Sequence, residues 1–224
     1  MKQIKLPTFD DIKHDPVFTA YLEQADMAMG ALGYTEHGFR HADLVAHISA
    51  NIMRRLSFPE RQADLAAIAG YLHDIGCSIS RSFHGVSGAL IAKPLLESKG
   101  LTPKEVAIVL SAIGNHEEDY GWATSEVSAA LILADKSDVH RSRVTNPDFA
   151  GFDIHDRVNY AAERSFLRVE AEEGTITLEI DIDTDISQVM EYFEIFLSRM
   201  IMCRRAADFL DCKFSLVINN TRLL

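Results

Sequence analysis

One stretch decides the fold class of this chain: residues 65–76, which read Leu65-Ala66-Ala67-Ile68-Ala69-Gly70-Tyr71-Leu72-His73-Asp74-Ile75-Gly76. Its apolar residues recur at helical spacing, and the run ends in a histidine and an aspartate. An ionised carboxylate inside a protein must be paired with positive charge or bind a metal, because its desolvation is otherwise too costly. The stretch therefore predicts a buried helix, ending near Gly76, that carries His73 and Asp74 to a polar site in the interior.

Similar patterns on both sides predict a series of helices. The expected segments are a helix from Asp15-Pro16 to about Gly30, one with Leu44, Val45, Ile48, Ile52 and Leu56 on one face, one opened by Ser57-Phe58-Pro59-Glu60, one from His84 to Ser98, one opened by Thr102-Pro103-Lys104-Glu105, and one beginning near Ser125. The segments at Ser57 and Thr102 have the Ser/Thr-x-x-Glu form of a capping box.

The pattern changes after Asn146-Pro147. Asp153 is expected to cap a short helix, and two alternating runs, 167–171 and 176–182, flank a Glu172-Glu173-Gly174 turn typical of a hairpin. A long apolar helix over 186–210 and a third alternating run, 214–218, complete the chain. We therefore expect a mainly α protein, with a helical bundle over residues 1–150 and a small α+β appendage over 151–224. The appendage is too small to bury a core alone, so it should pack on the bundle or form a homodimer.

Composition limits the classes of function. The chain has 224 residues, of which 47% are hydrophobic and 25% charged, and no apolar run has the roughly 20 residues of a membrane helix. With no apolar leader in residues 1–9, we expect a cytoplasmic protein. The formal net charge of −11 disfavours binding to nucleic acid polymers but not to a small phosphorylated substrate. Three cysteines without paired spacing argue against a disulfide framework or a structural zinc site.

Three further polar residues interrupt apolar helical faces. His41 lies on the inward stripe of its helix, His116 continues the Val109/Ile113 face, and Asp135 continues the Leu131/Ile132 face. Each histidine alone could be an ordinary core residue, but one site explains all of them together with His73 and Asp74. Imidazole nitrogens and carboxylate oxygens suit divalent ions, so we expect one or two of Fe, Mn, Zn, Mg, Co or Ni as cofactors.

The ordered set resembles the HD superfamily of metal-dependent phosphohydrolases. His41, then His73-Asp74 before Ile75-Gly76, then Asp135 within Leu133-Ala134-Asp135-Lys136 carry the resemblance, which covers about residues 30–145. The resemblance implies that His41, His73, Asp74 and Asp135 are metal ligands and that Asp74 can bridge two ions.

Two more histidines bear on the number of metals. His84, in His84-Gly85-Val86-Ser87-Gly88, and His116, in Gly114-Asn115-His116-Glu117, resemble two ligands of the dinuclear HD branches. Those branches include hydrolases of symmetric dinucleoside tetraphosphates and HD-type cyclic-dinucleotide phosphodiesterases. The sequence departs from them because His84 follows Asp74 by only ten residues. A hydrogen bond from His84 to substrate phosphate, or a solvent-facing position, is the alternative to metal ligation.

Two residues are candidates for contact with the substrate. His37 and His41 are four residues apart, a spacing that resembles the His-Asn-x-x-His-Ala pattern of cyclic-nucleotide phosphodiesterases, with Gly38 in place of asparagine. That resemblance implies that His37 protonates the leaving oxygen, whereas a solvated histidine before a helix is the alternative. Lys136 could neutralise phosphate oxygens or simply be the solvated end of a helix.

We therefore expect hydrolysis of a phosphate ester or anhydride, of a nucleotide or dinucleotide, by metal-activated hydroxide. Asp74, His37 and Lys136 are the expected catalytic residues. The alternatives are a mononuclear nucleotide phosphomonoesterase and a regulatory nucleotide-binding or assembly module with little turnover. A second His-Asp pair, His155-Asp156, is interpreted as the first turn of a helix rather than as part of the site.

Overall fold

The protein is described by a computed structural model over residues 6–146, 148 and 151–224. Its α-helices are α1 (Phe9–Lys13), α2 (Pro16–Ala31), α3 (Phe39–Arg55), α4 (Glu60–Leu72), α5 (His84–Lys99), α6 (Pro103–Gly114), α7 (Glu126–Lys136), α8 (Ile154–Ala161) and α9 (Val189–Phe209). Two short 3-10 helices, η1 (Ile75–Ser78) and η2 (Arg141–Arg143), follow α4 and α7. The expected mainly α fold with a small C-terminal sheet is confirmed.

The sheet has four strands in the order β1-β2-β3-β4: β1 (Ala162–Glu170), β2 (Thr175–Ile182), β3 (Lys213–Ile218) and β4 (Thr221–Arg222). β1 and β2 form the expected antiparallel hairpin, in which Gly174 adopts a φ of 60°. β2 and β3 are parallel, so α9 is the crossover that connects them. The alternating side chains pair in register, with Leu178 opposite both Leu167 and Leu216.

Two helices, α4 and α7, form the centre of the bundle. Every residue of α4 from Leu65 to Leu72 is buried, and so is every residue of α7 after Glu126, as expected for helices that neighbours surround. α4 contacts α3, α6 and α7. At Gly70 the approach of α3 is so close that a Cβ atom would lie 2.9 Å from the Ala46 backbone. The absence of a side chain there lets α3 and the end of α4 meet.

Most predicted helix boundaries are confirmed within two residues, but the helix expected to end near Gly76 ends at Leu72 and is followed by η1, and the long helix expected from residue 186 begins at Val189. Ser57 makes no capping box, because it adopts a φ of 62° and the helix begins at Glu60 with Pro59 as its N-cap. The capping box at Thr102 is present. On the expected apolar face of α3, Leu44 is 36% exposed, and on that of α9, Leu197 is 52% exposed. The helix α1 and the strand β4 were not predicted.

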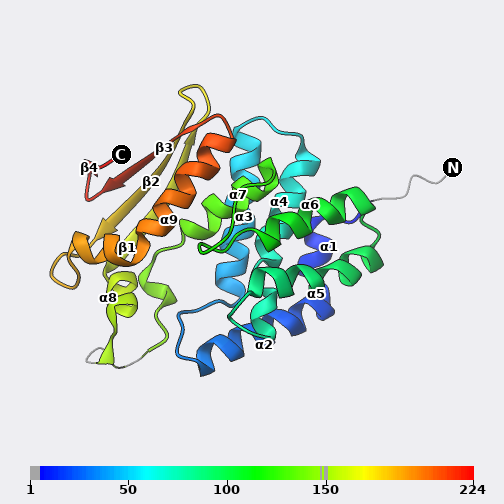
Figure 1. The fold of residues 1–224 in the computed structure, drawn as a ribbon, viewed down its shortest axis with the longest axis horizontal. Coiled ribbons are helices and arrows are strands. Elements are labelled where there is room, and N and C mark those ends of the chain that lie inside the picture. The colour runs from blue at the N-terminus through cyan, green and yellow to red at the C-terminus, as the bar shows by residue number, and fades with distance from the viewer. Residues whose placement is uncertain (1–5, 147, 149–150) are drawn as a thin grey trace.

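The C-terminal elements share a hydrophobic core with the helical bundle. Helix α9 buries Tyr192, Phe196 and Met200 and lies between α7 and the sheet (Figure 1), and its buried residues join one cluster with those of α4 and α7. The expectation that this helix packs on the bundle is confirmed. No helix in the described part of the chain is long and apolar enough to span a membrane.

We predict that a chain lacking residues 163–224 aggregates, because the face of α7 that α9 covers would become exposed apolar surface. Size-exclusion chromatography and binding of a hydrophobic dye would measure this, and a chain lacking only residues 221–224, which keeps α9, is the control. A truncated protein that stays soluble, monomeric and able to bind metal would contradict the prediction.

Candidate metal centre

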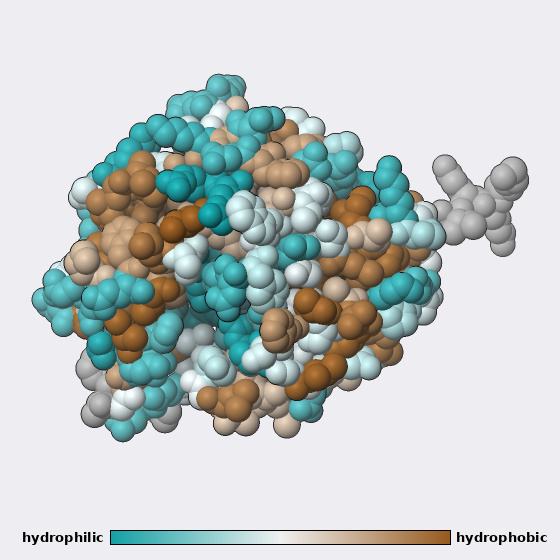
Figure 2. Space-filling model, in the orientation of Figure 1, coloured by the Kyte–Doolittle hydropathy of each residue, from teal (hydrophilic) through white to brown (hydrophobic). Residues whose placement is uncertain are grey.

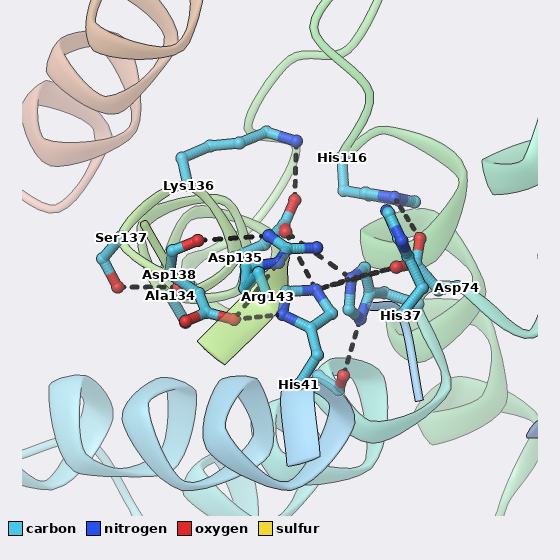
Figure 3. Close-up of polar contacts among 12 residues, drawn as sticks. His37, His41, Asp74, His116, Ala134, Asp135, Lys136, Ser137, Asp138 and Arg143 are labelled. Atoms are coloured by element: carbon cyan, nitrogen blue, oxygen red, sulfur yellow. Dashed lines mark hydrogen bonds and ion pairs between the residues drawn. The ribbon is translucent and has the colours of Figure 1, made fainter. Parts of the chain in front are cut away.

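Separate segments bring the six candidate ligands together in the interior. His41 lies near the start of α3, His73 follows α4, Asp74 precedes η1, His84 begins α5, His116 follows α6 and Asp135 lies at the end of α7. None of these residues is more than 8% exposed. Figure 3 shows the side chains of His41, Asp74, His116 and Asp135 pointing toward a common centre. We call these six residues the His/Asp cluster.

One half of the cluster surrounds one carboxylate oxygen of Asp74, Oδ2. This atom lies 3.1 Å from His73 Nε2 and 3.6 Å from His41 Nε2, and the two Nε2 atoms are 3.2 Å apart. Asp135 Oδ1 is 3.4 Å from His41 Nε2 and 3.6 Å from His73 Nε2. Two nitrogens and two carboxylate oxygens therefore lie within reach of a single small cation.

The other half surrounds the second oxygen of Asp74, Oδ1. This atom lies 3.1 Å from His84 Nε2 and 3.6 Å from His116 Nε2, and these two nitrogens are 3.0 Å apart. The guanidinium of Arg81 lies 3.1 Å from His84 Nε2, so a positive charge already lies beside this half. The two oxygens of Asp74 thus face two different pairs of histidines.

The remaining ring nitrogen of each histidine has an oxygen partner. The Nδ1 atoms of His41, His73, His84 and His116 lie 2.7, 2.8, 2.9 and 2.6 Å from Asp138 Oδ2, Gly70 O, Arg81 O and Ile113 O, respectively. A carbonyl or carboxylate oxygen can only accept a hydrogen bond, so Nδ1 donates in each case. The four Nε2 atoms that meet at the centre are thereby available as ligands, an arrangement typical of metal-binding histidines.

The short connection from Asp74 to His84 does reach the cluster. Phe83, the N-cap of α5, adopts a left-handed backbone with φ 57°, which turns the chain sharply into the helix. Gly76 lies so close to α5 that a Cβ atom there would be 2.0 Å from His84 O. This tight contact between η1 and α5 compensates for the few residues of the connection.

The electrostatics of the cluster demand positive charge. Burial disfavours ionisation of Asp74 and Asp135. The charge of His73 nevertheless holds the pKa of Asp74 well below its usual range, and the charge of Lys136 does the same for Asp135. Hydrogen bonds from the histidines lower both pKa values further. Burial also opposes charge on His73, but the two carboxylates outweigh it and raise the pKa of His73 to about 10. Two buried carboxylates therefore keep a cationic partner between them.

This donor set fits divalent metal ions. Imidazole nitrogens and carboxylate oxygens are the ligands of zinc, iron and manganese sites, and a metal can supply the positive charge that a proton on His73 otherwise provides. Two groups within the cluster have ligand atoms close enough to hold an ion, His41/His73/Asp74 and His73/His116/Asp135, and a third group, Asp74/Cys77/His84, adds Cys77 from η1. Burial raises the pKa of the Cys77 thiol, which disfavours the thiolate that a metal needs.

Lys136 is buried rather than solvated, because its side chain extends over the cluster. Its Nζ lies 2.6 Å from Asp135 Oδ2 and 3.3 Å from Glu118 Oε1. Glu118 Oε1 also forms an ion pair with Arg199, whose Nε lies 2.7 Å away. Burial opposes charge on Lys136, but Asp135 and Glu118 outweigh it and raise its pKa, so the ammonium stays charged beside the site.

His37 lies at the edge of the cluster. It precedes the first turn of α3, as the alternative held, but it is only 8% exposed and is therefore not solvated. Its Nδ1 hydrogen-bonds to Thr35 O, and its ring lies edge-on to that of His41 at 5.9 Å. Burial lowers the pKa of His37 well below its usual value, so this imidazole is neutral near pH 7.

Several residues of the site were missed by sequence reasoning. Asp138, three residues after Asp135, holds His41, and Arg81 and Arg199 line the recess over the cluster. Asp138 continues the helical spacing of Asp135 and could have been noticed. Arg81 and Arg199 come from two unrelated segments, and no local pattern distinguishes them from surface charges.

Comparisons with known proteins match the central part of the chain to a family. The sequence model of the HD domain matches residues 38–143, which include the whole His/Asp cluster. The uncharacterized protein MJ1020 of Methanocaldococcus jannaschii is 28% identical over 209 residues, covering 82% of this chain and 80% of that protein. A crystal structure described as a predicted HD superfamily hydrolase, from an uncultured Thermotogales bacterium, is 25% identical and aligns with a TM-score of 0.45 over 57% of this chain and 69% of its own.

We predict that Asp138→Asn weakens metal binding by roughly 10–100-fold, the usual cost of losing a residue that orients a metal-binding histidine. Burial favours a neutral Asp138, but the hydrogen bond from His41 and the charge of Arg143 hold its pKa well below the usual value, so the asparagine removes a buried negative charge. Titration with a competing chelator would measure the affinity. The exposed Asp208→Asn on α9 is the matched control, and equal affinities for both variants would contradict the prediction.

Proposed function

We propose that this chain, whose residues 38–143 match the HD domain, is a metal-dependent hydrolase that cleaves a phosphate ester or anhydride. The observation that carries the proposal is the position of Asp74, whose two oxygens face two pairs of histidines. A carboxylate placed in this way can bridge two cations, so we favour a dinuclear centre. His41, His73 and Asp135 would hold one ion with Asp74, and His84 and His116 would hold the other. A mononuclear centre would leave His84 and His116 only as partners of the Asp74 carboxylate or as contacts for the substrate phosphate.

When bound, such ions would lower the pKa of a water molecule and polarise the phosphoryl oxygens. The protein itself contributes cations to the same recess. Arg81, Lys136, Arg143 and Arg199 line it together with Asp74, Asp135 and Glu118, so local positive charge persists in a chain of net charge −11. Arginine and lysine here would bind the non-bridging oxygens of a phosphate group and stabilise the charge that develops there.

His37 is the proposed proton donor to the departing oxygen. Its neutral state near pH 7 is opposite to the state an acid needs. A phosphate group in the recess would raise the pKa of His37, because a nearby negative charge favours the imidazolium. On this proposal His37 acquires its proton when the substrate binds, and the hydrogen bond from Nδ1 to Thr35 O keeps its ring in place.

We predict that Asp74→Ala abolishes metal binding and hydrolysis together, because it removes the oxygens shared by both halves of the cluster. Metal content by mass spectrometry and turnover on a panel of nucleotides, dinucleoside polyphosphates and simple phosphate esters would test this, with Asp208→Asn as the control. Wild-type metal content and turnover in Asp74→Ala would refute the assignment. A wild-type protein that binds metal but hydrolyses nothing would favour the regulatory module.

We predict two metal ions per fully reconstituted chain and a fall toward one in His116→Ala, since His116 Nε2 lies 3.0 Å from His84 Nε2 and 3.6 Å from Asp74 Oδ1, in the half of the cluster proposed to hold the second ion. Equilibrium dialysis against Mn²⁺ followed by metal analysis would count the ions. A wild-type chain that saturates at one ion would support the mononuclear alternative instead.

A further inference from the structure

A second cavity of about 260 Å³ adjoins the recess over the His/Asp cluster. Both are lined by the same four residues, His37, Arg81, Arg143 and Arg199, which therefore lie where the two spaces meet. The outer cavity lies between the loop before α3 and the C-terminal helices α8 and α9. Figure 2 shows hydrophilic residues along the hollowed seam between the C-terminal elements and the helical bundle.

The chemistry of the lining changes from the inner to the outer part of this cavity. The shared residues at the inner end include three arginines, whereas the outer part has Asp153, the N-cap of α8, and Asp156 and Asn159 of α8. Cationic groups bind phosphate oxygens, and carboxylate and amide oxygens accept hydrogen bonds from hydroxyl or amino groups. The cavity is thus matched to a molecule with a phosphate at one end and hydrogen-bond donors at the other.

Asn159 carries the strongest sign of a missing ligand. It is 4% exposed, and its Nδ2 donates to His155 O at 2.9 Å. Because a carbonyl oxygen can only accept, this bond fixes which end of the amide is the nitrogen. The other end, Oδ1, is buried and has no hydrogen-bond partner among the described residues. Buried acceptors are nearly always satisfied in proteins, and Asn159 lines the cavity, so a molecule bound there can supply the missing donor.

Arg199 lies where the outer cavity meets the recess over the His/Asp cluster, and two contacts fix its guanidinium. Its Nε lies 2.7 Å from Glu118 Oε1, and its guanidinium stacks over the Phe196 ring at 4.3 Å. No described residue takes a hydrogen bond from either of its Nη groups. A guanidinium fixed on one edge and one face, with its other donors free, is suited to bidentate contact with a phosphate.

We propose that this cavity binds the organic part of the substrate, which is a phosphate monoester bearing hydroxyl or amino donors and no larger than about one nucleoside. Sites for drug-sized ligands usually have roughly 300–1,000 Å³, so a cavity of 260 Å³ is too small for a dinucleotide. Arg199 binds the phosphate, and Asn159 accepts a hydrogen bond from the organic part. Both residues lie outside the matched HD segment, 38–143, so the C-terminal appendage determines substrate specificity.

This inference rests on the proposed phosphohydrolase function. In the reaction, the oxygen of water forms a bond to phosphorus, the bond from phosphorus to the ester oxygen breaks, and the released alcohol takes up a proton. Inorganic phosphate is the other product.

The test separates binding from turnover. Phosphonates, in which carbon replaces the ester oxygen, cannot be hydrolysed in this way. Calorimetry on the metal-loaded chain would therefore measure the affinity of two phosphonates. One is the analogue of ribose 5-phosphate, and the other is benzylphosphonate, which has no hydroxyl or amino group on its organic part. We expect the wild type to prefer the ribose analogue. Asn159→Leu should reduce that preference about 10-fold, since it removes one buried acceptor. Arg199→Gln should weaken both analogues alike. Asn51→Leu, on an exposed position of α3, is the control.

The outcomes distinguish this inference from the proposed function. An unchanged preference in Asn159→Leu, a wild type that favours benzylphosphonate, or cleavage of diadenosine tetraphosphate as fast as of ribose 5-phosphate would overturn the inference. Thermal unfolding of each variant would show that the fold is intact. If the ribose analogue binds as expected but no phosphate ester is hydrolysed, the cavity is a binding site for such a ligand and the proposed hydrolytic function is overturned.

Discussion

The burial of two carboxylates, Asp74 and Asp135, is the constraint on which the rest of the structure depends. Neither could remain ionised in the interior without positive charge beside it, since a buried unpaired charge would destabilise the fold severely. The neighbouring histidines and Lys136 meet this need within the chain. The same arrangement leaves four Nε2 atoms and both carboxylates directed at a small central volume. An electrostatic requirement of folding and the capacity to bind cations therefore have a single origin.

The helical bundle keeps this cluster in place through contacts that are unrelated to metal chemistry. The glycines at 70 and 76 allow α3 and α5 to approach the ends of α4 and η1 more closely than any side chain would permit. Hydrogen bonds from the Nδ1 atoms then fix the rotation of each ring. Because the glycine contacts and three of the four Nδ1 hydrogen bonds involve backbone atoms, small shifts of the helices would disturb the cluster even if all six side chains remained.

The C-terminal elements extend the chemistry of the bundle rather than standing apart from it. Helix α9 shares the core of α7 and carries Arg199 toward the cluster, and α8 contributes acceptor groups to the adjoining cavity. The pair His155-Asp156 illustrates the point, since it does form the first turn of a helix, as expected, and yet it lines this cavity. A local pattern can identify the helix but not the space that the helix encloses.

The sequence by itself determined the mainly α fold, most helix boundaries and five of the six residues that meet in the cluster, because apolar periodicity and capping are local and a polar residue on an apolar face reveals its burial. The sixth, His84, was expected only from the resemblance to the dinuclear HD branches. Only the tertiary structure decided how those residues are arranged. It showed that His84 reaches Asp74 despite the short connection, that Lys136 is buried, and that Asp138 and Arg199 belong to the site. These outcomes depend on a left-handed backbone at Phe83, a close approach between Gly76 and His84, and the packing of α9 on α7, none of which the spacing of residues along the chain encodes.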